Sequence, residues 1–260
     1  MESSVAGSAM QVSASTPLPV VWSQFKEVDL HARHHSPCRG GDFFDALSVG
    51  QHVLFLLTDI AGLQLQAREV ALQVQYAFRQ RAQELFAGSD VNESDALAEL
   101  AHAFNLAVLE AAQGVRFAPT FLGCFNLTHG IFSYCNAGNL LALVRSEGNV
   151  RVLESSGMPL GLFSHTTFEA TILALQPGDA VLVVTKGVTG SRRGATDFGV
   201  ERVERMLKDA TAASASAICE ALLCEAHDFS HHPWSRFLSL FHKTPSCITD
   251  DLTALALVRR

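Results

Sequence analysis

Residues 53–62 have the sequence VLFLLTDIAG, a continuous apolar run that ends in a short polar turn. The run 53–57 is typical of a strand that is buried on both faces. Asp59 follows where this strand ends, and an unpaired charge next to a buried strand would be costly. The pattern therefore predicts a core strand that carries a functional acid at its end.

Three further segments place a polar residue where an apolar run meets a turn: GGDFFD (40–45), VTKGVT (184–189) and TDDLT (249–253). If the fold gathers these ends, Asp42, Asp59 and Asp250 form an oxygen-rich pocket that suits a hard divalent cation. Lys186 stands where a fourth acid is expected. The sequence thus predicts a metal pocket with one cationic member.

The composition favours a single globular domain. The chain has 260 residues, of which 48% are hydrophobic and 17% charged, so we expect a disordered leader at 1–20 and one domain at 21–260. A net charge of −7 without a basic run disfavours nucleic-acid binding. No run approaches the roughly 20 apolar residues of a membrane span, and the start is no convincing signal peptide, so we expect no membrane association and a cytoplasmic protein.

Periodicity predicts two long helices followed by many short strands. Apolar residues recur at three and four positions over 65–86, and again in a second helix that contains Leu97, Leu100 and Phe104. Two more helices fit 200–207 and 217–229. We expect strands at 28–35, 53–57, 120–125, 131–135, 140–144, 150–153, 168–173, 180–184 and 252–258. This order is typical of an α+β fold.

Residues 230–246 fit neither period. Their sequence, SHHPWSRFLSLFHKTPS, is too apolar for a solvated loop. We expect an insert that covers an apolar patch or contacts a partner.

The histidines show no ligand spacing, and we expect surface or packing roles for the residues at 34, 35, 231, 232 and 242.

Seven motifs together resemble a known family. They are GGDFFD, TDIAG (58–62), NAGN (136–139), MPLG (158–161), QPGD (176–179), KGVT (186–189) and DDLT (250–253). Their order and approximate spacing are similar to those of the SpoIIE/RsbU-like branch of the metal-dependent protein phosphatase 2C (PPM) family. The resemblance extends from about residue 28 to residue 259.

The resemblance implies two antiparallel β-sheets packed as a β-sandwich and flanked by antiparallel helix pairs. It implies two Mn²⁺ or Mg²⁺ ions at one end, with catalysis by a metal-activated water that attacks phosphoserine or phosphothreonine. Asp42, Asp59 and the Ile60 carbonyl would hold one ion, and Asp59 would bridge to a second ion held by Asp250. These three aspartates would be the catalytic acids. The remaining acids, Asp45 and Asp251, would either lie behind the metal ligands and help to orient them or have a purely structural role.

Lys186 departs from the family pattern, in which Thr-Asp-Gly is usual at the position of Thr185-Lys186-Gly187. Replacing a carboxylate by an ammonium changes the local charge by two units, and one pair of unit charges at ~4 Å is worth about 4 kcal/mol at an effective dielectric constant near 20. We therefore expect the second metal site to be weak or empty. The level of catalysis stays open between absent or impaired turnover, turnover with a single metal ion, and near-normal turnover. The direction of the Lys186 side chain stays open as well, because it would either turn to solvent or contact the substrate phosphate.

The sequence is compatible with two functions, an enzymatic one and a binding one. The first is a protein serine/threonine phosphatase that acts on a regulatory phosphoprotein, such as an anti-sigma-factor antagonist. The second is a pseudophosphatase that binds its partner without turning it over. Residues 65–112 and 230–246 would carry the binding, and self-association as a homodimer is left open.

Overall fold

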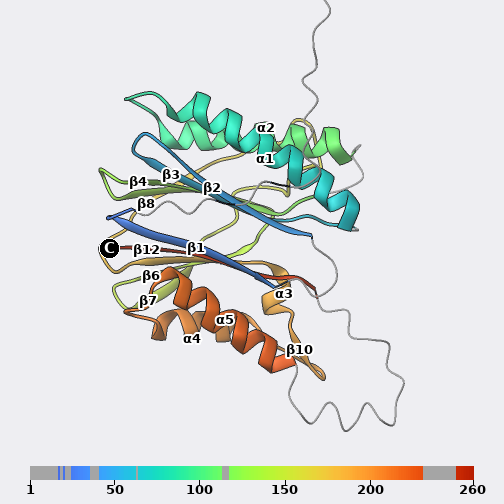
Figure 1. Cartoon of the computed structure of the whole chain (residues 1–260), viewed down its shortest axis with the longest axis vertical. Coiled ribbons are helices and arrows are strands. Elements are labelled where there is room, and N and C mark those ends of the chain that lie inside the picture. The colour runs from blue at the N-terminus through green and yellow to red at the C-terminus, as the bar shows by residue number, and fades with distance from the viewer. Residues whose placement is uncertain are drawn as a thin grey trace, which may run out of the picture.

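Two five-stranded antiparallel sheets face each other at the centre of the fold (Figure 1). The computed structural model describes residues 17, 20, 25–35, 41–62, 64–112, 117–230 and 250–260. The first sheet has the order β2 (Asp42–Val49), β3 (His52–Asp59), β4 (Thr120–Asn126), β5 (Ile131–Ala137) and β8 (Thr171–Ala174). The second has the order β1 (Val28–His35), β12 (Leu252–Arg259), β9 (Ala180–Val184), β6 (Leu141–Ser146) and β7 (Asn149–Val152).

A pair of helices covers the outer face of each sheet (Figure 1). Helices α1 (Gln64–Phe86) and α2 (Glu93–Ala112) lie on the first sheet, and α4 (Val200–Asp209) and α5 (Ala215–Ser230) lie on the second. This four-layer arrangement confirms the predicted α+β class with its sandwich and helix pairs. The described helices include none with the length and apolar character that a membrane crossing requires.

Strand β3 is buried on both faces because it separates two cores. Leu54 and Leu56 pack in the cluster beneath α1 and α2, whereas Phe55 and Leu57 pack between the sheets. Side chains alternate across a strand, so an apolar residue at every position fills both cores. The same logic explains β9, whose Leu182 faces α4 and α5 while its neighbours Val181 and Val183 enter the space between the sheets.

Helix α1 is held to the first sheet by a buried acid as well as by its apolar face. The fully buried Asp45 on β2 accepts hydrogen bonds from Arg79 Nε at 2.8 Å and Nη2 at 3.0 Å. Gln75 Nε2 donates to the same carboxylate at 3.1 Å. The bidentate pair compensates the buried charge, and it fixes the register of α1 on β2.

Some predictions of the strands were wrong in detail. Strand β2 was not predicted, because the acids at 42 and 45 and the polar Ser48 interrupt its apolar pattern. The strand predicted at 168–173 lies at Thr171–Ala174 instead, since Phe168 packs in the core beneath α1 and α2. The short helix α3 (Lys186–Thr189) and the hairpin of β10 (Arg192–Arg193) and β11 (Thr196–Asp197) were also missed. Residues 231–246 of the predicted insert, and nearly all of the leader, lie outside the described residues.

Gly123 on β4 is expected to be intolerant of any side chain. It pairs across the sheet with Phe55, and a Cβ at this position would clash with the Phe55 ring. That ring stacks on Phe132, with 5.9 Å between centroids, so it has little room to move. Gly123→Ala should lower the free energy of unfolding by about 2 kcal/mol, measured by urea denaturation.

Gly88→Ala is the matched control. Gly88 is exposed between α1 and α2, and a Cβ there makes only ordinary contact with Val91. Its effect should stay within about 0.5 kcal/mol. An unchanged stability of Gly123→Ala would contradict the tight packing between the sheets.

Candidate metal centre

Asp42 and Asp59 lie side by side because they are a cross-strand pair. Asp42 begins β2, Asp59 ends β3, and the antiparallel register places them opposite each other. The turn that follows is tied back to the same point, since Ile60 N donates to Gly41 O at 2.9 Å. A Cβ on Gly41 would lie 2.7 Å from Ile60 O, so only glycine lets the two backbones approach this closely.

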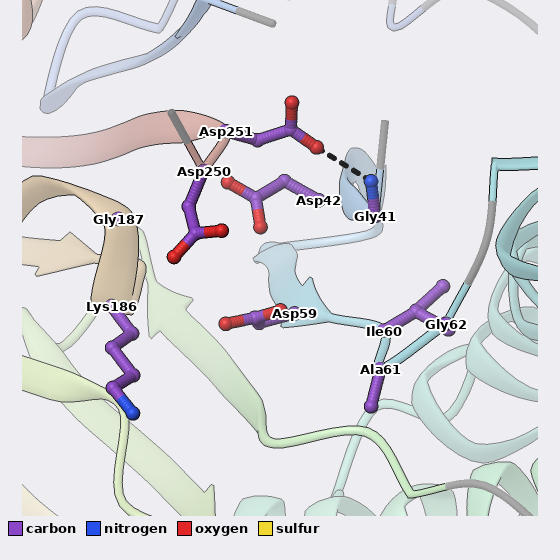
Figure 2. A pocket seen from close by; sticks show the side chains of 10 residues that line it. All are labelled: Gly41, Asp42, Asp59, Ile60, Ala61, Gly62, Lys186, Gly187, Asp250 and Asp251. Carbon is purple, nitrogen blue, oxygen red and sulfur yellow. Dashed lines mark hydrogen bonds between the residues drawn. The ribbon is translucent and has the colours of Figure 1, made fainter. Parts of the chain in front are cut away.

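The second sheet supplies the other charged groups. Asp250 and Asp251 directly precede β12, and Lys186 begins α3, with Thr185 between it and the end of β9. Gly41 N donates to Asp251 Oδ2 at 2.6 Å, which links the two sheets at this edge. The residues surround an open pocket of about 160 Å³ that is lined by Gly41, Asp42, Asp59, Ile60, Ala61, Gly62, Lys186, Gly187, Asp250 and Asp251 (Figure 2).

Two threonines of the second sheet hold the Asp42 carboxylate. Thr185 Oγ1 donates to Asp42 Oδ2 at 2.7 Å, and Thr253 Oγ1 donates to the same oxygen at 2.5 Å. The threonines are themselves joined, because Thr253 N donates to Thr185 Oγ1 at 3.2 Å. Both are buried. Asp42 is therefore fixed by partners from the opposite sheet.

The pocket is costly for negative charge. Burial raises the pKa of Asp42 to about 8, with a further upward contribution from Asp59 and an opposing one from the two threonine hydroxyls. Burial also raises the pKa of Asp59, and the charges of Asp250 and Asp251 raise it further. Acids crowded in this way are stabilised by a bound cation.

Lys186 lies at the rim and turns away from the acids. It is exposed, and Figure 2 shows its ammonium directed away from Asp250 and Asp59. Within the described residues it forms no ion pair with these carboxylates. Its charge still reaches the pocket, because it lowers the pKa of Asp59 against the stronger effects of burial and of the neighbouring acids. Lys186 thus adds positive charge without closing the pocket.

The remaining predicted residues divide between the pocket and the core. Ile60 and Asp251 line the pocket, whereas Asp45 does not, since its carboxylate is engaged with Arg79 and Gln75. Asn139, the last residue of the NAGN motif, is not among the lining residues. It adopts a left-handed backbone with a φ of 66°, a conformation that asparagine tolerates well.

The donor set fits a divalent cation in its chemistry and only in part in its arrangement. Carboxylate and carbonyl oxygens are the ligands that Mg²⁺ and Mn²⁺ prefer. Yet no three His, Cys, Asp or Glu side chains of the described chain are already gathered closely enough to hold a metal ion. Protein donors engage Asp42 Oδ2 and Asp251 Oδ2. The oxygens of Asp42, Asp59 and Ile60 are of the kind that one cation requires, and Lys186 brings no oxygen donor to the pocket.

Comparisons with known proteins identify the family of the chain. The family model of stage II sporulation protein E (SpoIIE) matches residues 50–259. The chain belongs to the SpoIIE family. The fold class matches as well, and this confirms the predicted SpoIIE/RsbU-like branch of the PPM phosphatases.

Individual relatives cover different shares of the chain. Protein IcfG of Synechocystis is 34% identical over 83 residues, a match that covers 32% of this chain and 13% of IcfG. The RsbU and RsbW domains of Rv1364c from Mycobacterium tuberculosis have a TM-score of 0.70 at 24% identity, over 90% of this chain and 62% of theirs. RsbX in complex with magnesium has a TM-score of 0.63 at 16% identity, over 92% of this chain and 98% of that one.

Sequence reasoning missed the polar residues that surround the SpoIIE-type acids. Thr185 and Thr253 stand beside two of the motifs, but their role depends on the contact between sheets. His34 is exposed, as a surface role predicts, and in addition its Nδ1 lies 2.7 Å from Thr253 Oγ1. The only signal available was their position, since each of these residues lies at or next to the end of a strand, on the side of the second sheet where Asp250 and Asp251 lie.

The number of Mn²⁺ ions that the pocket binds, and the affinity for them, are expected to depend on the residue at position 186. Calorimetric titration with Mn²⁺ should show one binding event for the native chain and two for Lys186→Asp, because aspartate restores a donor and removes a positive charge. Lys186→Met removes only the charge. It should tighten the single event about tenfold without adding a second.

Two tight Mn²⁺ sites in the native chain would contradict this account. Asp59→Asn is the negative control, and it should abolish binding in every background because Asp59 would serve both positions.

Proposed function

We propose that this SpoIIE-family domain is a metal-dependent protein serine/threonine phosphatase with reduced turnover. The observation that carries the proposal is that Asp42, Asp59 and Asp250 come from both sheets and line one open pocket. The pocket is of a size that admits a phosphoryl group with its surrounding water, and its acids are of the type that binds Mn²⁺ or Mg²⁺. We propose one strong cation position and one that Lys186 weakens.

The chain's own residues would divide the work as follows. Asp42 and Asp59, with the Ile60 carbonyl, hold a divalent cation, and Asp250 faces them across the pocket (Figure 2). Divalent cations of this kind neutralise phosphoryl oxygens and lower the pKa of water. Lys186 at the rim offers an ammonium to the phosphate monoester as it enters. This contact would aid binding of the dianion while the lost carboxylate slows its hydrolysis.

The proposed substrate is a phosphoserine or phosphothreonine on a regulatory protein of the type of an anti-sigma-factor antagonist. The resemblance of the sequence motifs to the SpoIIE/RsbU-like branch supports this substrate class, and the fold is shared with RsbX and with the RsbU and RsbW domains. The opening of the pocket to solvent supports a protein substrate, because a phosphorylated side chain on a folded surface must reach the acids from outside. The domain of residues 21–260 would carry this activity.

A pseudophosphatase is the second candidate, and Lys186 is the observation that favours it. Lys186 replaces a residue that is usually aspartate in the family, and no three acids of the described chain lie close enough together to hold a metal ion. Such a protein would bind the phosphorylated partner and protect it from other phosphatases. The native chain and Lys186→Asp would then differ in turnover and agree in partner binding.

The decisive assay is Mn²⁺-dependent hydrolysis of p-nitrophenyl phosphate and of a phosphoserine peptide. The native chain should show slow turnover that EDTA abolishes, and Lys186→Asp should raise kcat at least about tenfold, since the restored carboxylate stabilises the second cation. Asp59→Asn should be inactive in both backgrounds.

The outcomes separate the two candidates. Activity confined to Lys186→Asp supports the pseudophosphatase and shows that the rest of the pocket is intact. Full native activity that aspartate at position 186 does not raise would refute the weakening effect of Lys186. No activity in either protein would contradict the phosphatase assignment.

A further inference from the structure

Hydrogen bonds lead from the edge strand β1 to the candidate metal ligand Asp42. His34 Nδ1 lies 2.7 Å from Thr253 Oγ1, and Thr253 Oγ1 lies 2.5 Å from Asp42 Oδ2. The sheet register makes this contact, since His34 on β1 pairs directly with Thr253 on β12. His34 is not among the described residues that line the pocket, and its hydrogen-bonded route to Asp42 runs through Thr253.

The donor and the acceptor in each of these hydrogen bonds follow from the Thr253 hydroxyl. Thr253 Oγ1 carries a single proton, and an ionised Asp42 can only accept. Thr253 therefore donates to Asp42 and has lone pairs left for His34. The contact with His34 then requires a proton on Nδ1, so a cation-binding Asp42 selects the Nδ1–H form of the ring.

A second hydroxyl completes the cradle. Thr185 Oγ1 also donates to Asp42 Oδ2, at 2.7 Å. Two donors use the lone pairs of Oδ2, and within the described part of the chain no donor to Oδ1 is seen. The carboxylate is thereby held in one orientation before any ligand arrives, which is how residues behind a metal ligand raise affinity.

We propose that His34 is a positioning residue that acts through Thr253 to hold Asp42 for a divalent cation. The inference rests on the proposed function in one respect, because it requires a cation at Asp42. It adds a residue that none of the family motifs contains, on a strand that supplies none of the proposed ligands.

The surroundings of His34 suit this role. Its outer side is exposed, yet burial of the rest of the ring lowers its pKa, with the charge of Asp251 acting in the opposite direction. A ring kept neutral carries one proton, so its placement on Nδ1 or Nε2 matters. His35, the next residue, faces elsewhere and contacts the His227 ring edge-on at 5.3 Å between centroids.

The test compares Mn²⁺ affinity by calorimetry in His34→Ala, His34→Asn and His35→Ala, each in the native and Lys186→Asp backgrounds. His34→Ala should weaken binding roughly three- to tenfold, the effect of one lost hydrogen bond. His34→Asn places an amide N–H near the position of Nδ1 and should restore affinity to within about twofold, and His35→Ala should match its parent.

A spectroscopic measurement distinguishes positioning from a general loss of structure. The ring nitrogens of His34 in the Mg²⁺-loaded protein should show the Nδ1–H form by ¹⁵N NMR, with the signals assigned from their absence in His34→Asn. Thr253→Val should abolish this preference, since valine has the shape of threonine and no hydroxyl.

Each outcome decides. If the parent binds Mn²⁺ and His34→Ala binds it equally well, or if the loaded ring carries its proton on Nε2, the positioning role is wrong and the phosphatase proposal stands. If neither background binds Mn²⁺, both proposals are wrong.

Discussion

The hydrogen bonds from Thr185 and Thr253 to Asp42 are the contacts on which the pocket depends. Asp42 belongs to the first sheet and both threonines to the second, so the bonds cross the sandwich at its open edge. Hydrogen bonds to a charged acceptor typically contribute about 1.5–3 kcal/mol each. They join the two sheets where the packed aromatic core between them ends, and they fix the acid that begins β2. The position of Asp59 follows, because Asp59 is its cross-strand partner.

The charges at this end of the sandwich explain why Lys186 is compatible with the fold. Burial raises the pKa of Asp42 and of Asp59, and the neighbouring acids raise it further. Such an arrangement is unfavourable for the folded protein unless a cation binds or a positive side chain approaches. Lys186 supplies positive charge at the rim, which lowers the pKa of Asp59 in part, and it stands where a carboxylate is expected from the sequence. We expect selection for partner binding to tolerate this exchange and selection for rapid turnover to oppose it.

The sequence was most informative where one residue pattern had one physical explanation. The run at 53–57 predicted β3 because only a strand between two cores needs an apolar side chain at every position. Helices α1 and α2 followed from their apolar periodicity, and the acids at 42, 59 and 250 from their places at strand ends. Strand β2 was missed because it contains the charged residue Asp45, and a charge in a short segment usually indicates a turn. Asp45 is buried in the strand only because it pairs with Arg79, which lies 34 residues away and could not be identified as its partner from the sequence. The threonines and His34 were missed because their contacts depend on the register of β1 on β12 and on the packing of two sheets, and neither is encoded in local periodicity.

The number of cations that the native pocket holds tests the account most directly. Crystals of the native chain grown with Mn²⁺ can be measured for anomalous scattering at the manganese edge, which locates each ion independently of activity. The account predicts one strong peak, between Asp42, Asp59 and the Ile60 carbonyl, and no second peak of comparable height beside Lys186. Two peaks of equal height, with the second ion beside Asp250 and Lys186, would contradict it.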